Sequence, residues 1–359
     1  MKATSKKKKI IIIVLIVLLV LNIADFAFSV YIYKDNFDKR YTAQGFLPKI
    51  EDFDELYATR HEFTSDKGQT LVGYMYRTLP DTDRPKGIVV MAHGLGGGGH
   101  IHYLNVIDWF ARHGYLVFAY DCTGNDESGG DVVGGLPQGI IDLDHAISFV
   151  EEEYQDLPVV LFGHSWGGYS VMSVLKYHPE VKAAAECSGF VAATDMFEIE
   201  GKNQAGYAIY AMLPYVKLYD RIKFGKYSAN GALEAFAASE TPVMVIHSTD
   251  DDVVPFDYGY EKIYEKYGSD PRFEFVRYED TGHNHVFESK EKRDTLNNKF
   301  KDWLDDLGYD YEAEENAERL ETDKDYYMNN IMDKHEWNDT LNDELFEQID
   351  AFYEKGISK

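Results

Sequence analysis

From about residue 55 onward, apolar residues form short runs that alternate with longer segments in which they recur at helical spacing. A short apolar run rich in β-branched residues predicts a buried strand, and an apolar stripe with a period of 3.6 residues predicts an amphipathic helix. Strands that alternate with helices predict an α/β fold with a mostly parallel sheet and helices on both faces. The expected elements are an opening hairpin at 61–78, strands at 88–91, 116–120, 157–162, 181–185, 243–246 and 273–278, and helices at 103–113, 136–154 and 169–177.

The first 33 residues follow a different pattern. Residues 10–33 are almost wholly apolar, with Asp25 as the one charged residue. At about 1.5 Å per residue this segment is long enough to cross a hydrocarbon core of about 30 Å. The lysines within residues 1–9 favour the cytoplasmic side, which predicts a signal-anchor helix with the body outside the cytoplasm and Tyr31 and Tyr33 at the far interface. A cleaved secretory signal is the alternative, because residues 27–29 resemble a cleavage site.

The α/β alternation breaks between residues 190 and 238, where Gly201, Pro214 and Gly225 interrupt the pattern. This segment is expected to form an insertion with short helices at 194–200, 205–213 and 232–238.

After residue 308 the composition shifts to Asp, Glu and Tyr, and we expect a helical appendage on the surface of the α/β domain, with disorder as the alternative for 309–321. The predicted parts are a basic cytoplasmic N-terminus at 1–9, a transmembrane signal-anchor at 10–33, a linker at 34–55, the α/β domain at 56–308 with its insertion at about 190–238, and an acidic C-terminal appendage at 309–359 with Leu345, Ile349 and Phe352 at helical spacing.

The chain is strongly acidic, with a formal net charge of −26. The lysines of residues 1–9 make the remaining body more acidic still. This charge argues against nucleic acid, an anionic membrane surface or a strongly anionic substrate as a partner of the body. The partners we expect are a small acyl ester or lipid and, through the N-terminal helix, the membrane; the oligomeric state stays open.

Cysteine and histidine usage gives no sign of a metal centre. The chain has two cysteines, Cys122 and Cys187, each after a predicted strand, and the sequence leaves open whether they pair. No Cys/His cluster has zinc spacing. His100 and His102 lie in a glycine-rich loop and are interpreted as solvated loop residues. We therefore expect no metal and no cofactor.

A Gly-x-Ser-x-Gly motif, Gly163 to Gly167, directly follows the predicted strand 157–162 and precedes a helix. In this context the motif is typical of a nucleophile elbow, a sharp turn that lifts one hydroxyl above the sheet edge. The glycines are needed because a side chain at either position would clash. Ser165 is therefore the predicted nucleophile.

Two partners for this serine follow later strands in the order Ser, Asp, His. Asp250, Asp251 and Asp252 all follow strand 243–246, and we choose Asp251 for its spacing to Pro255, leaving the others as turn carboxylates or helix caps. After strand 273–278, His283 is the predicted general base because it directly follows a glycine. The alternative histidine is His285.

Strand 88–91 runs into a glycine-rich loop that begins at His93. Such a loop lets a backbone N–H approach a developing oxyanion, and the expected donors are the amides of Leu95 and Trp166. His93 and Gly94 are interpreted as support for this loop. A phosphate-binding loop is disfavoured, because neither Lys-Ser/Thr nor the GxGxxG spacing is present.

Taken together, these residues resemble the α/β-hydrolase superfamily, and within it the serine aminopeptidase-like and monoacylglycerol lipase-like hydrolases. The resemblance covers about residues 55–308 and implies that the insertion forms a cap over Ser165. Two segments depart from the family pattern: residues 123–128 replace Arg-Gly-His-Gly-x-Ser, and His247-Ser248 replaces His-Gly. The matching segments are 93–95, 120–124, 163–168, 251–255 and 282–284.

The function predicted from these motifs and the resemblance is a membrane-anchored, extracytoplasmic serine hydrolase that cleaves carboxylic esters through an acyl-enzyme on Ser165. One alternative is an aminopeptidase or amidase of the same fold, in which Asp195, Glu198 or Glu200 would bind the substrate amine. Another is a non-catalytic extracellular binding protein, and other chemistries of this fold stay open. Six cap residues suit either an acyl pocket or packing of the cap onto the body: Tyr207, Tyr210, Met212, Leu213, Tyr215 and Tyr219.

Overall fold

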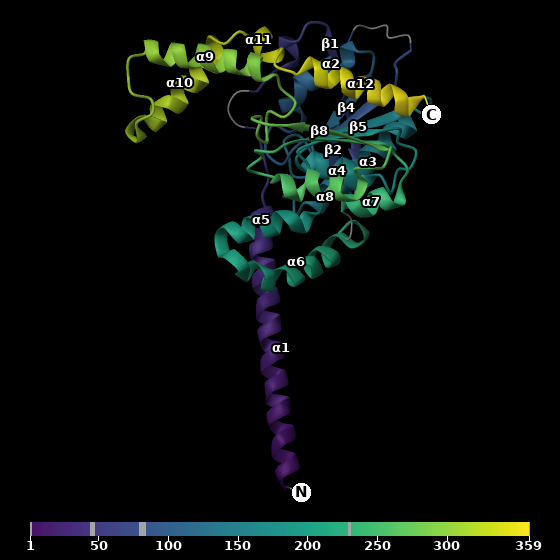
Figure 1. Cartoon of the computed structure of the whole chain (residues 1–359), viewed down its shortest axis with the longest axis vertical. Coiled ribbons are helices and arrows are strands. Elements are labelled where there is room, and N and C mark those ends of the chain that lie inside the picture. Colours follow the sequence, from purple (N-terminus) through teal and green to yellow (C-terminus); the bar gives the residue numbers. More distant parts are fainter. Residues whose placement is uncertain (1, 44–46, 79–83, 229–230, 359) are drawn as a thin grey trace.

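The computed structural model describes residues 2–43, 47–78, 84–228 and 231–358, and an eight-stranded sheet forms its centre (Figure 1). The strand order is β1-β2-β4-β3-β5-β6-β7-β8. β2 pairs antiparallel with β1 and β4, and all other neighbours are parallel, which confirms the predicted mostly parallel sheet. The strands are β1 (Leu56–Thr64), β2 (Thr70–Thr78), β3 (Ile88–Ala92), β4 (Leu116–Tyr120), β5 (Val159–His164), β6 (Ala184–Cys187), β7 (Val243–Ser248) and β8 (Phe273–Tyr278).

Helices bury both faces of the sheet, as the unbroken apolar runs of its central strands require. Because side chains alternate along a strand, Ile88 and Val90 of β3 pack toward α3, α4, α7 and α8, whereas Val89 and Met91 pack toward α2 and α12. The helix bounds are α2 (Leu104–Arg112), α3 (Pro137–Glu153), α4 (Trp166–Val174), α7 (Ala232–Ala238), α8 (Tyr260–Tyr267) and α12 (Asp343–Ile357).

The C-terminal helix differs from the expected surface appendage. Phe346 and Ile349 of α12 are fully buried in the same apolar layer as α2. The hydroxyl of Tyr353 donates a hydrogen bond to the carbonyl of Leu161 in β5 (2.6 Å). The apolar face of α12 is thus part of the core, because it covers a sheet face that α2 alone leaves open.

An excursion of three helices separates β8 from α12 and projects from the body (Figure 1). Its two ends lie side by side: the amide of Ser289 donates to the carbonyl of Thr340 (2.8 Å), and the amide of Asn342 donates to that of Phe287 (3.1 Å). The chain therefore leaves and rejoins the body at one narrow neck. The helices are α9 (Lys290–Asp306), α10 (Ala317–Asn330) and α11 (Lys334–Asn338).

The insertion between β6 and β7 begins with α5 (Ala193–Ala205) and α6 (Ile209–Phe224), a helix pair that we call the cap. We predict a helix end near Pro214, yet α6 continues through this residue. Buried Leu213, Val216 and Phe224 lie on either side of the proline. Their packing outweighs the hydrogen bond that proline removes from the helix.

The N-terminal helix α1 (Lys2–Phe37) extends beyond the predicted span at both ends. Its part from residue 6 onward is long and apolar enough to cross a membrane, judged by length and composition. The end nearest the body packs against the cap (Figure 1). There Tyr33 is fully buried instead of lying at a membrane interface. Tyr31, by contrast, is exposed.

We predict that Phe346→Ala lowers the free energy of unfolding by about 3–5 kcal/mol, because it leaves a cavity between α12 and the sheet. Urea unfolding of the full chain in detergent measures this loss. Tyr326→Ala in the exposed α10 is the matched control and should change stability by no more than about 0.5 kcal/mol. Equal, small effects of both substitutions would contradict a structural role for α12.

Candidate active site

Ser165 lies in a strained turn between β5 and α4. Its backbone has φ 56° and ψ −115°, a conformation that residues other than glycine rarely adopt. The flanking glycines allow three backbone segments to touch: a Cβ on Gly163 would lie 2.3 Å from the carbonyl oxygen of Gly167, and one on Gly167 would lie 1.9 Å from that of Ala92. The turn therefore holds the Ser165 hydroxyl at the carboxyl edge of the sheet.

Three predicted side chains meet at this edge in one line of hydrogen bonds. The Nε2 atom of His283 lies 2.9 Å from Oγ of Ser165, and its Nδ1 lies 2.8 Å from Oδ2 of Asp251. The alternative residues have other partners: His285 pairs with Glu288 (2.6 Å), and Asp250 accepts hydrogen bonds from the Ser248 hydroxyl and the Gly282 amide.

The buried carboxylate of Asp251 is held by donors on both oxygens. Oδ1 accepts from the amides of Val253 (3.0 Å) and Val254 (2.8 Å), and Oδ2 lies 3.2 Å from Nε2 of a second histidine, His247. Burial alone would raise the pKa of Asp251, but the hydrogen bonds from His247 and His283 hold it well below its usual range. An ionised Asp251 fixes a proton on Nδ1 of His283, which leaves Nε2 free to accept the serine proton.

His93 fixes the loop that we expect to hold the oxyanion. Its Nε2 accepts the amide proton of Cys122 (3.0 Å), so its Nδ1 carries the proton and donates to the carbonyl of Gly94 (2.6 Å). Burial lowers the pKa of His93, which keeps the ring neutral. In a trans peptide the next amide, that of Leu95, points away from this carbonyl. Leu95 and Trp166 line the same cavity as Ser165.

Two residues that the sequence analysis did not single out join the glycine-rich loop to the loop that carries His283. The Tyr103 hydroxyl accepts from the amide of Gly94 (3.1 Å) and donates to Nδ1 of His164 (2.8 Å). Nε2 of His164 then donates to the carbonyl of His283 (3.0 Å). Burial, together with the nearby His283, lowers the pKa of His164 to about 3, so this ring stays neutral. His164 is a free position of the Gly-x-Ser-x-Gly motif, and the motif alone therefore does not point to it.

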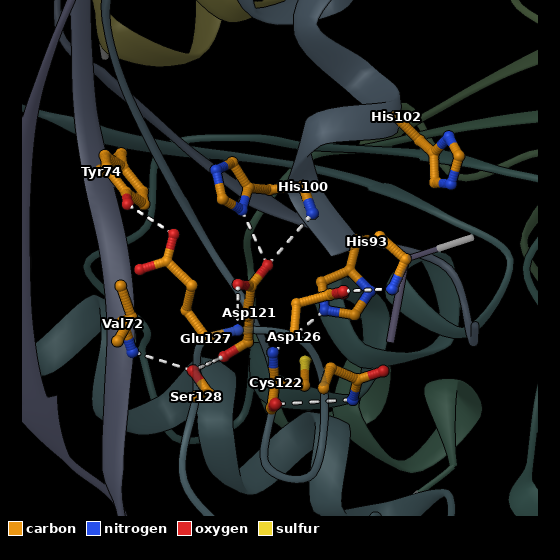
Figure 2. Close-up of polar contacts among 12 residues, drawn as sticks. Val72, Tyr74, His93, His100, His102, Asp121, Cys122, Asp126, Glu127 and Ser128 are labelled. Carbon is orange, nitrogen blue, oxygen red and sulfur yellow. Dashed lines mark hydrogen bonds and ion pairs between the residues drawn. The ribbon is translucent and has the colours of Figure 1, made fainter. Parts of the chain in front are cut away.

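The structure corrects the interpretation of His100 as a solvated loop residue. His100 is buried, with Nδ1 2.8 Å from Oδ1 of Asp121 (Figure 2). Asp121 also accepts from the amide of Glu127 (3.2 Å), and its carbonyl accepts from the Ser128 hydroxyl (2.6 Å). Residues 123–128, which depart from the family pattern, thus hold Asp121 in place, and Asp121 in turn holds His100 at the base of the glycine-rich loop. His102 is exposed, as expected for a loop residue.

The two cysteines are free, buried thiols. The question that the sequence leaves open is therefore answered for this structure, in which Cys122 and Cys187 do not form a disulfide.

A cavity of about 790 Å³ opens above Ser165 and His283. Apolar side chains from the cap and from α1 line it, but none of the six cap residues that suit an acyl pocket is among the lining residues that the structure describes. Tyr219 instead packs against Tyr33, and Tyr207 is 86% exposed. The apolar lining consists of Ile32, Phe37, Leu136, Phe190, Met196, Phe197, Ile209 and Val253, with Leu95 and Trp166.

The three candidate amine-binding carboxylates are not equivalent. Glu200 lines the cavity. Asp195 pairs with Lys262 (3.1 Å), and Glu198 pairs with Lys202 (2.7 Å) and accepts from two tyrosine hydroxyls. Only Glu200 is therefore placed, among these three, to meet a molecule in the cavity.

Comparisons with known proteins agree with this architecture. Residues 83–230 match the family model described as serine aminopeptidase, S33. A solved esterase of Pyrococcus furiosus superposes with a TM-score of 0.53 at 18% identity, covering 75% of this chain and 96% of that one. The chain has the α/β-hydrolase fold, and these matches support its assignment to the α/β-hydrolase superfamily.

The chain also resembles lipases in sequence. It is 32% identical over 134 residues to a monoacylglycerol lipase of Mycolicibacterium smegmatis, covering 36% of this chain and 46% of the relative. It is 34% identical over 87 residues to a monoglyceride lipase of Rattus norvegicus, covering 23% and 28%. The chain thus spans less than half the length of these curated relatives.

A buried carboxyl group beside the site makes the stability of this chain depend on pH. Glu186 is fully buried, and burial raises its pKa to about 7. Nearby His247 and the hydrogen bond from the Gly189 amide lower the pKa, but they offset only part of the effect of burial. The folded-state pKa lies above the ordinary value of 4.5, so the folded state favours protonated Glu186. The stability that this preference gives the fold is complete below about pH 4.5 and is lost as pH rises through 7.

We predict that Glu186→Gln removes this dependence. Between pH 4.5 and pH 8 the wild-type chain should lose on the order of 3 kcal/mol of unfolding free energy relative to the variant, because Gln stays neutral throughout. Urea unfolding at a series of pH values measures the difference. Parallel stability curves for the two proteins would show that Glu186 is ionised in the folded state.

Proposed function

We propose that this α/β-hydrolase is a membrane-anchored, extracytoplasmic serine hydrolase that cleaves carboxylic esters through an acyl-enzyme on Ser165. The observation that carries the proposal is the line of hydrogen bonds from Ser165 through His283 to Asp251, which opens into a cavity with a largely apolar lining. Such a line is what nucleophilic catalysis by a serine requires.

The proposed reaction runs in two halves. Oγ of Ser165 attacks the ester carbonyl carbon as Nε2 of His283 takes its proton, and the tetrahedral intermediate then breaks its C–O bond to the alcohol, which leaves with that proton. Water next attacks the acyl-enzyme, giving its proton to His283, and the carboxylic acid leaves as Ser165 recovers the proton. Asp251 stabilises the imidazolium that forms in each half.

The amides of Leu95 and Trp166 are the proposed donors to the oxyanion. Their alignment depends on neighbours that carry no charge. Neutral His93 holds the Gly94 carbonyl, and Tyr103 holds the Gly94 amide, so the peptide that carries the Leu95 N–H is fixed before substrate binds. A preformed donor needs no reorganisation during the reaction, which is the source of its catalytic effect.

Esters are the preferred substrates because the cavity is largely apolar and the sequence relatives are named as lipases of monoacylglycerols. An aminopeptidase or amidase is the alternative, favoured by the match to the serine aminopeptidase model and by Glu200 in the cavity wall. A non-catalytic binding protein on this scaffold is disfavoured, because it would not need the strained Ser165 backbone.

A retained anchor is preferred over a cleaved signal. Asn22 and Phe26 lie on the N-terminal side of the candidate cleavage site, and both contact Tyr215 of the cap. Cleavage would remove these contacts. The lysines of residues 1–9 favour the cytoplasmic side, which leaves the hydrolase body outside the cytoplasm.

Ser165→Ala is expected to reduce hydrolysis of p-nitrophenyl butyrate by at least about 10³-fold, because the acyl-enzyme can no longer form. The assay uses the full chain in detergent, with aminoacyl p-nitroanilides beside the ester. Turnover of the anilides alone would favour the aminopeptidase. A wild-type chain that turns over neither substrate and is not labelled at Ser165 by a fluorophosphonate would refute the enzyme.

Asp251→Asn is expected to lower kcat by about 10⁴-fold while leaving ester binding largely intact, because asparagine stabilises the wrong tautomer of His283. Asp252→Asn is the matched control: this neighbouring carboxylate is exposed and should be dispensable. Steady-state kinetics on the same ester measure both. Equal losses in the two variants would mean that Asp251 does not orient the histidine.

A further inference from the structure

The last turns of α1 form part of the wall of the cavity above Ser165. Ile32, Asn36 and Phe37 line the same cavity as Ser165 and His283. The predicted membrane anchor is therefore more than a tether, because its end is built into the candidate active site.

The helix is held in this position by buried contacts with the cap. The hydroxyl of Tyr33, itself fully buried, donates to Oδ1 of Asp220 in α6 (2.5 Å). The Tyr33 ring stacks on Phe197 of α5, with ring centroids 5.0 Å apart. Between them these contacts fix α1 to both cap helices.

Contacts between α1 and the cap continue toward the membrane segment. The Tyr215 hydroxyl of α6 donates to Oδ1 of Asn22 (2.7 Å), and the rings of Tyr215 and Phe26 lie edge to face, with centroids 6.5 Å apart. In Figure 1, α6 lies beside α1 at the lower edge of the body. The cap thus reaches down to a part of α1 that belongs to the predicted membrane span.

Below Asn22 the remaining apolar helix is too short to cross a bilayer by itself. Residues 10–21 are all exposed apolar side chains, and at about 1.5 Å per residue they cover only about 18 Å of a hydrocarbon core of about 30 Å. The outer leaflet must therefore rise past Asn22 and reach the cap. Exposed Leu218 and Ile222 of α6 give the cap an apolar surface for this contact.

An apolar row on α1 connects this leaflet with the cavity. Phe28 is 55% exposed and lies one turn before the cavity-lining Ile32, on the same side of the helix. Ala24 and Leu21, both exposed, extend the row downward at spacings of four and three residues. An acyl chain that follows this row stays in contact with apolar side chains from the bilayer to the cavity.

We infer that α1 guides the acyl chain of a bilayer-resident ester into the active-site cavity, with Phe28 on the route and Ile32 in the wall. This inference rests on the proposed ester hydrolysis and specifies its substrate as a single-chain amphiphile taken from the leaflet around α1. The overall charge of −26 makes a neutral leaflet the appropriate surface.

The first test uses the full chain in neutral phosphatidylcholine vesicles, with p-nitrophenyl palmitate in the bilayer and p-nitrophenyl acetate in the water. Ile32→Trp narrows the cavity and should lower the palmitate-to-acetate rate ratio by about tenfold or more. Tyr31→Trp, at an exposed neighbouring position outside the cavity lining, is the matched control and should leave the ratio unchanged. An unchanged ratio in Ile32→Trp would overturn the inference.

A second pair of variants tests the route itself. Phe28→Asp places a charge on the apolar row and should slow hydrolysis of vesicle-bound palmitate by about tenfold. The loss should be much smaller when the same ester is presented as monomers in dilute detergent, and Ile23→Asp, at an exposed position on the other side of the helix, should not produce it. Equal losses in both variants, or in both presentations, would overturn the inference.

The two tests separate the inference from the function on which it rests. If the wild-type chain hydrolyses neither ester and resists the fluorophosphonate, the proposed function fails. If it hydrolyses both esters and the variants at positions 28 and 32 behave like their control variants at positions 23 and 31, only the role of α1 fails.

Discussion

The close approach of three backbone segments at the end of β5 is the constraint on which the site depends. Without a Cβ, Gly167 lets the elbow lie against the carbonyl of Ala92, and this contact sets the distance between the serine turn and the glycine-rich loop. Neutral His93 then holds the glycine-rich loop, and neutral His164 holds the segment that carries His283. Both act through hydrogen bonds that require a fixed tautomer of the ring. Because burial lowers the pKa of both rings and keeps them uncharged, this framework does not change around neutral pH.

Much of this arrangement could be predicted from the sequence because parallel strands end at one edge of a sheet. Ser165, Asp251 and His283 each follow a strand, so finding the strands brings the three side chains together. The roles of Tyr103 and His164 could not be predicted in the same way. Their bonds join segments far apart in the chain, and neither residue belongs to the defined positions of a motif.

The predictions that were wrong share a physical cause, which is packing between distant segments. Apolar residues at helical spacing mark α12 as amphipathic, but the spacing does not say what covers its apolar face. In the structure this face packs on the sheet. Pro214 is a helix breaker in isolation, but buried residues on both sides carry α6 through it. His100 follows glycines in a loop, and its burial is explained by distant partners, Asp121 and the hydroxyl of Tyr76.

The narrow neck at Ser289 and Thr340 bears on how this chain can vary. Two backbone hydrogen bonds close the excursion of α9 to α11 at its base, and the same neck joins the histidine loop to α12. The entropy cost of closing a loop grows only logarithmically with its length, so a long excursion costs the fold little more than a short one. The segment between the two ends can thus change in length at little entropic cost to the neck, while Lys334 and Asn338 of α11 tie its last part to Asp52 of the body.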